Sequence, residues 1–502
     1  MSRIEREQWL FQPPRYRHLE NSERWHDSFW DAAKEATELT WDITSIYSIM
    51  SQAFVVGDRT LVQEVRRQPW MSHDESGRLA EIPQHGLKWA TPGQIASGLR
   101  ERLEDELESA CRDFNEVWIL LSGGLDSRIV AGVCSRLLHS GRIQKPPKTV
   151  TWGLEDSRDV HYAKLVAGKL GFSWKHLPLD ETHLLDNTLN NAVQIGNLAS
   201  PIHFHRMDWF ASLPSDAMVL GGSYGDSVGR SEFSGRTVLE LTSIGPRNRT
   251  PFLNPDFQHQ AAEEMKQELA NLQDRSGNCA KYVQFEHQQQ GHYMRGHIAH
   301  VMNVINQSCR LYQAFTAPSV FSYMWSFHPA ARTNEVYTHL LSQLGNGLVD
   351  VPWPRTNVAV NGSKQLSKRN LRASYHNYQN WTRNILSEQL LPSIEFLQEL
   401  DWLNYKKTKS CLETICLKQD HRFGSEYNEF LIWLLSIKSF CDRCKQQPNM
   451  PGWQPRDSQL PEDRPSKLRL FSRRSKFVSK RLKSLRRYLL RRKSKLKFPP
   501  EY

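Results

Sequence analysis

A glycine-rich turn between a short apolar run and an amphipathic segment is the feature that most constrains the fold of this chain. Residues 121–127 read Leu-Ser-Gly-Gly-Leu-Asp-Ser, after the apolar residues 117–120 and before residues 128–138, whose apolar side chains recur at helical spacing. Two adjacent glycines allow a tight turn that leaves backbone N–H groups open. The N-terminus of the following helix adds partial positive charge, and the Ser122 and Ser127 hydroxyls add donors. The segment therefore predicts a strand, a turn and a helix that together cradle a phosphate or a pyrophosphate.

Strand and helix patterns alternate along the next part of the chain. The sequence predicts strands at residues 148–153, 172–179 and 217–220, and helices at 160–170 and 182–195. This alternation favours an α/β fold built on a doubly wound parallel sheet with right-handed crossovers. Ligands of such sheets bind beyond the carboxyl ends of the strands. We therefore expect the glycine-rich ends of the first, second and fourth strands to meet at one crevice.

A second candidate segment follows the fourth predicted strand. Residues 221–226 read Gly-Gly-Ser-Tyr-Gly-Asp, which brings Asp226 to the same predicted crevice as Asp126. Two carboxylates suit Mg²⁺ that is also bound to the phosphates of a nucleotide. Plainer interpretations stay open, because a glycine turn joins a strand to a helix without any ligand in many proteins, and an Asp after a strand often caps a turn or a helix. The loop is not of the Walker type, since no Gly-Lys-Ser/Thr closes it.

The segment 121–127 resembles the pyrophosphate loop of the ATP pyrophosphatases, and most closely that of the asparagine synthetase family. Residues 221–226 resemble the Gly-x-Gly-x-Asp-Glu type segment of the same family. The resemblance implies a sheet of the adenine nucleotide alpha-hydrolase (PP-loop) type, with ATP and Mg²⁺ as cofactors. It also implies a ligase that activates a small-molecule carboxylate as an acyl-adenylate with release of pyrophosphate. Ammonia or an amine then attacks, and conversion of aspartate to asparagine is the default substrate pair.

The resemblance also implies roles for individual residues. It makes Asp126 and Asp226 the carboxylates that hold Mg²⁺ and pyrophosphate, and therefore both catalytic and metal-binding. It assigns the nucleotide and its phosphates to Leu121, Ser122, Gly123, Gly124, Leu125, Ser127, Trp152, Gly221 and Gly222. A catalytic Lys of the family has no direct counterpart, and the nearest match is Arg355. Arg355 itself, Lys364 or Lys368 from the following loop are the open choices for that positive charge.

Two further departures concern the second carboxylate segment. Ser223 stands where the family usually has Glu, and Ser227 stands where it often has Glu after the second Asp. These changes, with the missing Lys, keep an alternative open. In that alternative the chain is a catalytically altered relative that binds a nucleotide and acts as a scaffold.

The N-terminal part points to an external nitrogen source. The glutamine-dependent enzymes of the family begin with an exposed cysteine, whereas this chain begins Met1-Ser2-Arg3. Residues 1–97 resemble the remnant or junction of a glutaminase domain, and residues 98–445 form the predicted ATP-binding domain. We therefore expect free ammonia, an amine substrate or a separate glutaminase as the nitrogen source.

The middle of the chain after the predicted sheet has mainly helical patterns. Residues 282–311 contain no proline, and the spacing of apolar residues in 423–440 predicts an amphipathic helix. Four cysteines, Cys411, Cys416, Cys441 and Cys444, provide enough sulfur for a zinc site, but their spacing favours ordinary reduced thiols. Histidines His203, His205, His292, His297 and His300 lack acidic ligands at a fixed offset, so structural or solvent-facing roles are favoured over metal binding.

The carboxyl-terminal part changes composition abruptly. A Pro-rich linker at 446–463 precedes a basic amphipathic tail at 464–502, and residues 464–498 contain 16 Lys or Arg and no Asp or Glu. The chain as a whole has a formal charge of +11, so the basic excess resides in this tail. Val478, Leu482, Leu485 and Leu489 form one apolar stripe on a cationic helix, which suits an anionic membrane surface. Nucleic acid is a weaker alternative, and a solvated charge run is the plainest interpretation.

Composition is consistent with an enzyme of the cell interior. The longest apolar run, residues 430–435, is far shorter than the roughly 18 residues that a membrane-spanning helix needs. The first residues are charged and lack the apolar core of a signal peptide. We expect a cytoplasmic protein whose tail could also attach it peripherally to the inner membrane face.

Overall fold

The computed structural model describes residues 10–453, except for 12, 21–23, 73–82, 84, 113, 232–243, 248, 276, 278, 363–369, 418–423, 447–449 and 451. The predicted tail at 464–502 and most of the predicted linker at 446–463 lie outside the described residues. Lys364 and Lys368 lie outside them as well. The compact unit considered below spans Met1–Pro455.

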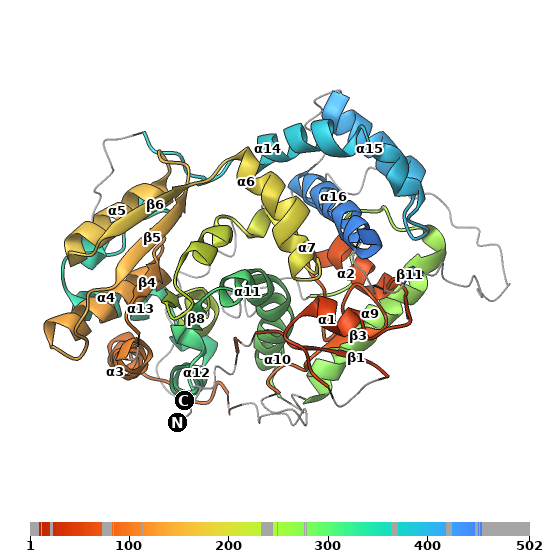
Figure 1. The fold of residues 1–502 in the computed structure, drawn as a ribbon. Coiled ribbons are helices and arrows are strands. Elements are labelled where there is room, and N and C mark those ends of the chain that lie inside the picture. The colour runs from red at the N-terminus through yellow and green to blue at the C-terminus, as the bar shows by residue number, and fades with distance from the viewer. Residues whose placement is uncertain are drawn as a thin grey trace, which may run out of the picture. The chain divides into compact units, whose positions relative to one another are not determined.

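A five-stranded parallel sheet lies at one side of this unit (Figure 1). Its strands, in spatial order, are β6 (Trp174–Pro178), β5 (Lys148–Gly153), β4 (Val117–Leu120), β7 (Met218–Gly221) and β8 (Arg310–Gln313). The first strand of the sheet along the chain is the central β4. The next two, β5 and β6, add on one side of β4, and β7 and β8 then add on its other side. The predicted α/β class with a parallel central sheet is thus confirmed, and the switch point between β4 and β7 is where such sheets bind ligands.

The central strands are apolar because both faces of the sheet are covered. Ile119 is fully buried and pairs with Thr149 on one side and Leu220 on the other. Continuous apolar runs, rather than alternating ones, are the pattern expected of a parallel sheet covered on both faces. The adjoining helices that pack with one another are α3 (Pro92–Arg112), α4 (Leu125–His139), α5 (Arg158–Leu170) and α13 (Asn334–Leu344).

The expected helix at 282–311 was wrong at its C-terminal end. Helix α10 (Lys281–Gln288) continues through a wider helical stretch, Gln289–Ala299, into α11 (His300–Asn306), but Arg310 and Leu311 belong to the fifth strand. The Asn306 side chain accepts a hydrogen bond from the Leu311 N–H at 2.9 Å, which ends the helix and turns the chain into β8. Pairing with β7 then overrides the local helical pattern, because it completes the hydrogen bonding of the sheet.

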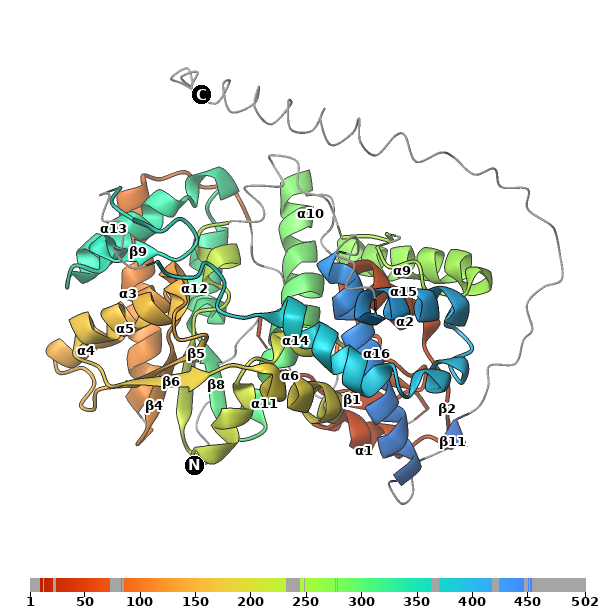
Figure 2. The same cartoon turned by 90° about the horizontal axis from the view of Figure 1, so that it is seen from above.

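The remaining elements form a largely helical half (Figure 2). Its helices and those between the two halves are α1 (Phe29–Ala33), α2 (Ile43–Gln52), α6 (Glu181–Asp186), α7 (Ala192–Gln194), α9 (Pro255–Arg275), α14 (Tyr378–Ile385), α15 (Tyr405–Leu417) and α16 (Ser425–Gln446). Its short strands are β1 (Tyr16–His18), β2 (Glu38–Leu39), β3 (Val65–Arg67) and β11 (Gly452–Trp453), and β9 (Pro352–Trp353) pairs with β10 (Val358–Ala359) nearer the sheet. Helix α12 (Pro318–Trp325) instead packs against α3 on the sheet side. Among the described residues, no helix combines the length and apolarity of a membrane span.

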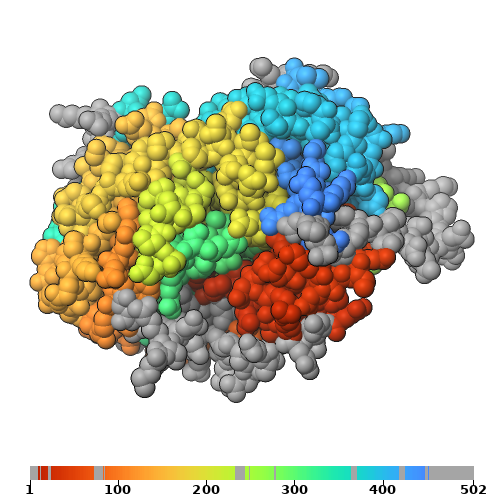
Figure 3. Space-filling view, in the orientation of Figure 1, coloured from red at the N-terminus to blue at the C-terminus, as the bar shows by residue number. Residues whose placement is uncertain are grey.

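The N-terminal segment and the last long helix share one hydrophobic core. The Trp30 ring lies 4.8 Å from the Phe440 ring of α16, measured between centroids, and both side chains are buried. The Trp30 indole also donates to the Val193 carbonyl at 3.0 Å. The space-filling view shows the N-terminal residues in red beside α16 in blue (Figure 3). The described part of the predicted N-terminal region thus shares a hydrophobic core with the helical half.

Candidate active site

The loop at 121–127 is held in shape by its own side chains. The Ser127 hydroxyl accepts from the Ser122 N–H at 3.1 Å and donates to the Ser122 carbonyl at 3.0 Å, and the Gly124 N–H donates to the Ser122 hydroxyl at 3.2 Å. The Leu121 N–H extends the β4 pairing by donating to Val150. These bonds fix a tight turn at the N-terminus of α4, where backbone donors and the helix dipole favour an anion.

The Arg128 side chain holds this loop in place through hydrogen bonds to backbone carbonyls. Its buried guanidinium donates to the Gly123 carbonyl at 2.7 Å and to the carbonyls of Leu348, Val351 and Pro352. Burial without a carboxylate partner lowers the pKa of Arg128 to about 10. The guanidinium thus ties the loop to the segment that leads into β9, a long-range role that was not predicted from the sequence.

The end of β7 presses directly against the loop. A Cβ at Gly222 would lie 2.9 Å from the Asp126 carbonyl carbon and 3.0 Å from the Ser127 nitrogen. A Cβ at Gly123 would lie 2.6 Å from the Pro354 ring. Glycine is required at Gly222 because two backbones approach more closely than a side chain permits, and at Gly123 because the rigid Pro354 ring occupies the space of a Cβ.

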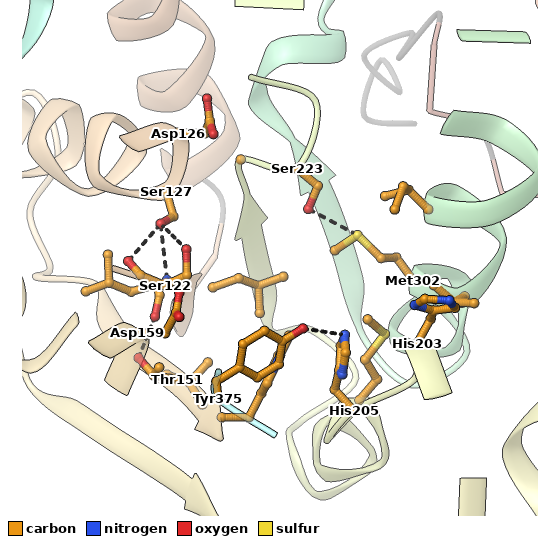
Figure 4. Close-up of a pocket in the computed structure, with 18 of the residues that line it drawn as sticks. Ser122, Asp126, Ser127, Thr151, Asp159, His203, His205, Ser223, Met302 and Tyr375 are labelled. Carbon is orange, nitrogen blue, oxygen red and sulfur yellow. Dashed lines mark hydrogen bonds between the residues drawn. The ribbon is translucent and has the colours of Figure 1, made fainter. Parts of the chain in front are cut away.

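A cavity of about 390 Å³ opens beside the loop, at the carboxyl ends of β4, β5 and β7 (Figure 4). Its lining includes Leu121, Ser122, Asp126, Ser127, Trp152, Gly222 and Asp226 from the predicted site residues. Gly123, Gly124, Leu125, Gly221 and Arg355 are not part of the lining. The exposed Arg355 side chain lies over the Trp353 ring, 5.1 Å from its centroid.

The loop carboxylate is paired with an arginine that sequence reasoning missed. The Arg230 guanidinium contacts both oxygens of Asp126, with Nε 3.4 Å from Oδ1 and Nη2 3.3 Å from Oδ2. The Arg230 side chain is 5% exposed and lies over the Tyr337 and Trp353 rings. Arg230 lies four residues after the 221–226 segment but 104 positions from Asp126 along the chain. Local sequence patterns therefore could not reveal the pair.

The donor set fits a phosphate-bound magnesium ion better than a metal held by protein alone. Among the described residues, no three His, Cys, Asp or Glu side chains gather as metal ligands. Asp126 and Asp226 nevertheless line the same cavity as two serine hydroxyls. Mg²⁺ commonly takes one or two carboxylates and completes its shell with substrate phosphates and water.

Comparison of the sequence with known proteins identifies its relatives. The family model described as asparagine synthase matches residues 98–421. The chain belongs to the asparagine synthase family. Glutamine-hydrolysing asparagine synthetases from Bos taurus and Gallus gallus are 34% identical to it over 77 residues, and that from Homo sapiens is 32% identical over 77 residues. The aligned stretch spans 15% of this chain and 14% of each of these relatives.

A further acidic group lies in the cavity of this member of the asparagine synthase family, and it was not predicted as a site residue. Asp159, in the first turn of α5, lines the cavity near the loop. Burial raises its pKa to about 6, against a small opposing effect of Arg158. The Ser157 hydroxyl caps α5 by accepting from the Val160 N–H. Asp159 is therefore available to face the cavity rather than to cap the helix.

The wall opposite the loop is built from histidine, methionine and apolar side chains (Figure 4). It comprises His203, His205, Met207, Ile298, Val301, Met302 and Tyr375. His205 has both ring nitrogens near tyrosine hydroxyls, with Tyr378 at 2.6 Å and Tyr375 at 3.4 Å. Burial keeps the pKa of His205 well below its usual value, so this ring stays neutral.

The other histidines and the cysteines have internal positions. His292, His297 and His300 are buried. Cys411, Cys441 and Cys444 are buried and Cys416 is half-buried, and all four are free thiols. His203 and His205 line the cavity with the predicted phosphate loop, a position that was not predicted from the sequence.

The position of Ser223 shows how this family member departs from the expected carboxylate pattern. The Ser223 hydroxyl donates to the Met302 sulfur at 3.3 Å, and its N–H donates to the Gln313 side chain at 3.1 Å. Ser223 thus contacts the wall opposite the loop, and its side chain supplies no ionisable group there.

Proposed function

We propose that this protein is an ATP-dependent amide-forming ligase that activates a carboxylate as an acyl-adenylate. One observation carries the proposal: Ser122, Asp126, Ser127 and Asp226 line one cavity at the switch point of the parallel sheet. Membership of the asparagine synthase family and the names of its relatives, asparagine synthetases, support the same reaction class. The parallel sheet and its loop support a PP-loop type of nucleotide site.

The nucleotide is proposed to lie along the carboxyl ends of β4, β5 and β7. Leu121, Trp152, Gly221 and Gly222 would contact the adenosine side, while Ser122, Gly123, Gly124, Leu125 and Ser127 would hold the phosphates. The positions of the loop donors at the start of α4 and of Trp152 at the end of β5 support this division. The cavity is large enough for part of a nucleotide and a small carboxylate.

The first chemical step is attack of a substrate carboxylate oxygen on the α-phosphorus of ATP. The bond between the α-phosphorus and its bridging oxygen breaks, and pyrophosphate leaves with the electron pair. The loop N–H groups and serine hydroxyls would stabilise the charge that develops on the leaving group, where one well-placed donor is worth about 10²–10³ in rate. Mg²⁺, when bound by Asp126 and Asp226, would neutralise phosphate charge.

The second step joins carbon to nitrogen. Ammonia or an amine attacks the acyl carbon, an amide forms, and AMP leaves. Aspartate and ammonia are the default pair, and a separate glutaminase is a candidate supplier of the ammonia. Arg355 is retained as the candidate for the missing lysine, since its guanidinium lies beside Trp353, whose ring also contacts Arg230.

Pyrophosphate release tests this proposal. Purified protein is incubated with Mg-ATP and a panel of carboxylates, aspartate first, with and without ammonium. We expect release that requires a carboxylate and falls at least about 10²-fold in Asp126→Asn. Asp256→Asn, an exposed carboxylate at the start of α9, is the matched control and should keep full activity.

The other outcomes separate the alternatives. ATP binding that depends on Asp126 without pyrophosphate release from any carboxylate would favour the nucleotide-binding scaffold. Absence of ATP binding would contradict the proposal itself.

A further inference from the structure

A histidine and a glutamate from distant parts of the chain form a pair at the wall opposite the phosphate loop. His203 lines the cavity, and its Nε2 lies 3.1 Å from Oε1 of Glu429. The His203 side chain is 27% exposed and that of Glu429 is 13% exposed. The ring therefore reaches the cavity while its carboxylate partner is withdrawn from solvent. Figure 4 shows His203 beside Met302, across the cavity from Ser122 and Ser127.

Several contacts fix the position of this pair. Glu429 lies on α16, and its second oxygen accepts from Arg249 at 3.3 Å. His203 ends the short helical turn Pro201–His203, and the indole of Trp433, also on α16, donates to the Asn197 carbonyl just before that turn at 2.9 Å. The helix that carries the carboxylate thus also anchors the segment that carries the histidine.

This geometry sets which ring nitrogen is basic. A carboxylate that also accepts from Arg249 acts only as an acceptor, so in the neutral His203 ring the proton lies on Nε2 and the lone pair on Nδ1. The His297 ring packs edge-on against His203 at 4.0 Å between centroids. Burial holds the pKa of His297 well below its usual value, so this neighbour is uncharged. A histidine oriented by a carboxylate is a recurrent general base.

The other polar groups of the cavity are less suited to accept a proton at this wall. Asp126 is engaged by Arg230 at the loop, Asp159 lies on the loop side near Ser122 (Figure 4), and Asp226 is the second carboxylate proposed for Mg²⁺. His205 has both nitrogens near tyrosine hydroxyls. Ser223 offers only a hydroxyl, which is directed to the Met302 sulfur. His203 combines access to the cavity with a carboxylate that orients it.

We infer that His203, oriented by Glu429, is the general base of amide formation. The inference rests on the proposed function and adds a catalytic residue to it. The nitrogen lone pair of the amine forms a bond to the acyl carbon, and the bond from that carbon to the AMP oxygen breaks with its electrons on AMP. Nδ1 of His203 takes the surplus proton from the nitrogen. Glu429 is a positioning residue that stabilises the resulting imidazolium.

The experiment separates the two half-reactions. The carboxylate that supports pyrophosphate release is used to measure ATP–pyrophosphate exchange, which reports adenylate formation alone, and then amide formation with ammonium. We expect His203→Gln to keep exchange within about threefold of the unmodified protein, and to lose about 10²–10⁴-fold in amide formation, the usual contribution of a general base. Hydroxylamine, a strong nucleophile that sheds its proton readily, should restore product formation in this variant.

Matched variants control the result. His183→Gln removes a half-buried histidine outside the cavity that also pairs with a carboxylate, that of Asp180 at 2.6 Å, and should leave both half-reactions unchanged. Glu429→Gln should reduce the turnover number of amide formation by about tenfold with little change in KM for ATP. His203→Asn provides a second test if the glutamine variant does not fold.

Three results would overturn the inference. Loss of exchange together with amide formation in a folded His203 variant would make His203 structural or substrate-binding. Unchanged amide formation would exclude it as the base, and failure of hydroxylamine to restore product would exclude proton removal as its role. If the unmodified protein shows no exchange with any carboxylate, the proposed function itself fails and the base has no reaction to serve.

Discussion

At the scale of single residues, the candidate site is defined by pairings that neutralise charge. Asp126 is the clearest case, because a nearly buried guanidinium contacts both of its oxygens. A divalent ion would have to share or displace this partner before it could use the carboxylate fully. Arg230 therefore stabilises the loop when no metal is bound, and it competes with a metal ion for Asp126.

Replacement of Arg230 by Met should destabilise the protein by about 2–3 kcal/mol, since it leaves a partly buried carboxylate without its partner. The double variant Asp126→Asn with Arg230→Met should recover at least half of this loss. Urea unfolding of both single variants and the double variant measures the coupling. Additive losses would show that the two residues contribute independently.

Asp159 gives the protein a pH dependence of known sign. Because its pKa is about 6 in the folded state and about 3.9 in an unfolded chain, the folded state holds the extra proton between these values. Its contribution to stability is therefore present below about pH 4 and is lost as pH rises to about 6. Above that pH, Asp159→Asn should be more stable than the unmodified protein by about 1–3 kcal/mol.

The measurement is the difference in unfolding free energy between Asp159→Asn and the unmodified protein at pH 4.5 and pH 7. Asp156→Asn is the control, because this exposed carboxylate pairs with Arg372 at the surface. A difference that does not change with pH would show that Asp159 is not titrating in this window.

At the scale of elements, the site depends on how closely β7 approaches the loop. Gly222→Ala places a methyl group 2.9–3.0 Å from backbone atoms of Asp126 and Ser127, which have no freedom to rotate away. We expect the loop to shift and the Kd for ATP to rise at least about tenfold, as overpacking typically costs 1–3 kcal/mol. Gly168→Ala, on an open surface of α5, is the control and should bind ATP normally. Equal ATP affinity in both variants would contradict this account.

What sequence could predict at this scale follows from local patterns. The strands at β4, β5 and β7 and the helices α4 and α5 have clear periodicity and glycine turns, and their order alone indicates a parallel sheet. Strand β8 was missed because its four residues follow a helix directly and become a strand only through pairing with β7. Arg230 and Glu429 were missed for a similar reason, since their partners lie 104 and 226 positions away along the chain.

At the scale of the whole molecule, the compact unit and the basic tail should be separable in function. The unit Met1–Pro455 contains the loop, the cavity and both members of the His203–Glu429 pair. A variant that ends at Pro455 should bind ATP and release pyrophosphate as the full chain does. It should lose binding to vesicles of anionic lipid, because each Lys or Arg near such a surface contributes about 1 kcal/mol.

Cosedimentation with phosphatidylglycerol vesicles checks this prediction, with phosphatidylcholine vesicles as the uncharged control. Equal binding of the truncated and full chains would remove the tail from membrane attachment. Binding of the full chain to RNA instead of vesicles would favour a nucleic-acid partner.

The shared core of Trp30 and Phe440 has a consequence for how the protein is made. Trp30 reaches the ribosome exit about 400 residues before its ring partner on α16 does. At the usual elongation rate of about 5–20 residues per second, this interval lasts on the order of 20–80 s. The buried apolar side chains of the N-terminal segment therefore lack their final contacts during most of translation. A chaperone that holds nascent chains should associate with this segment, and premature termination before α16 should yield products that are degraded rather than folded.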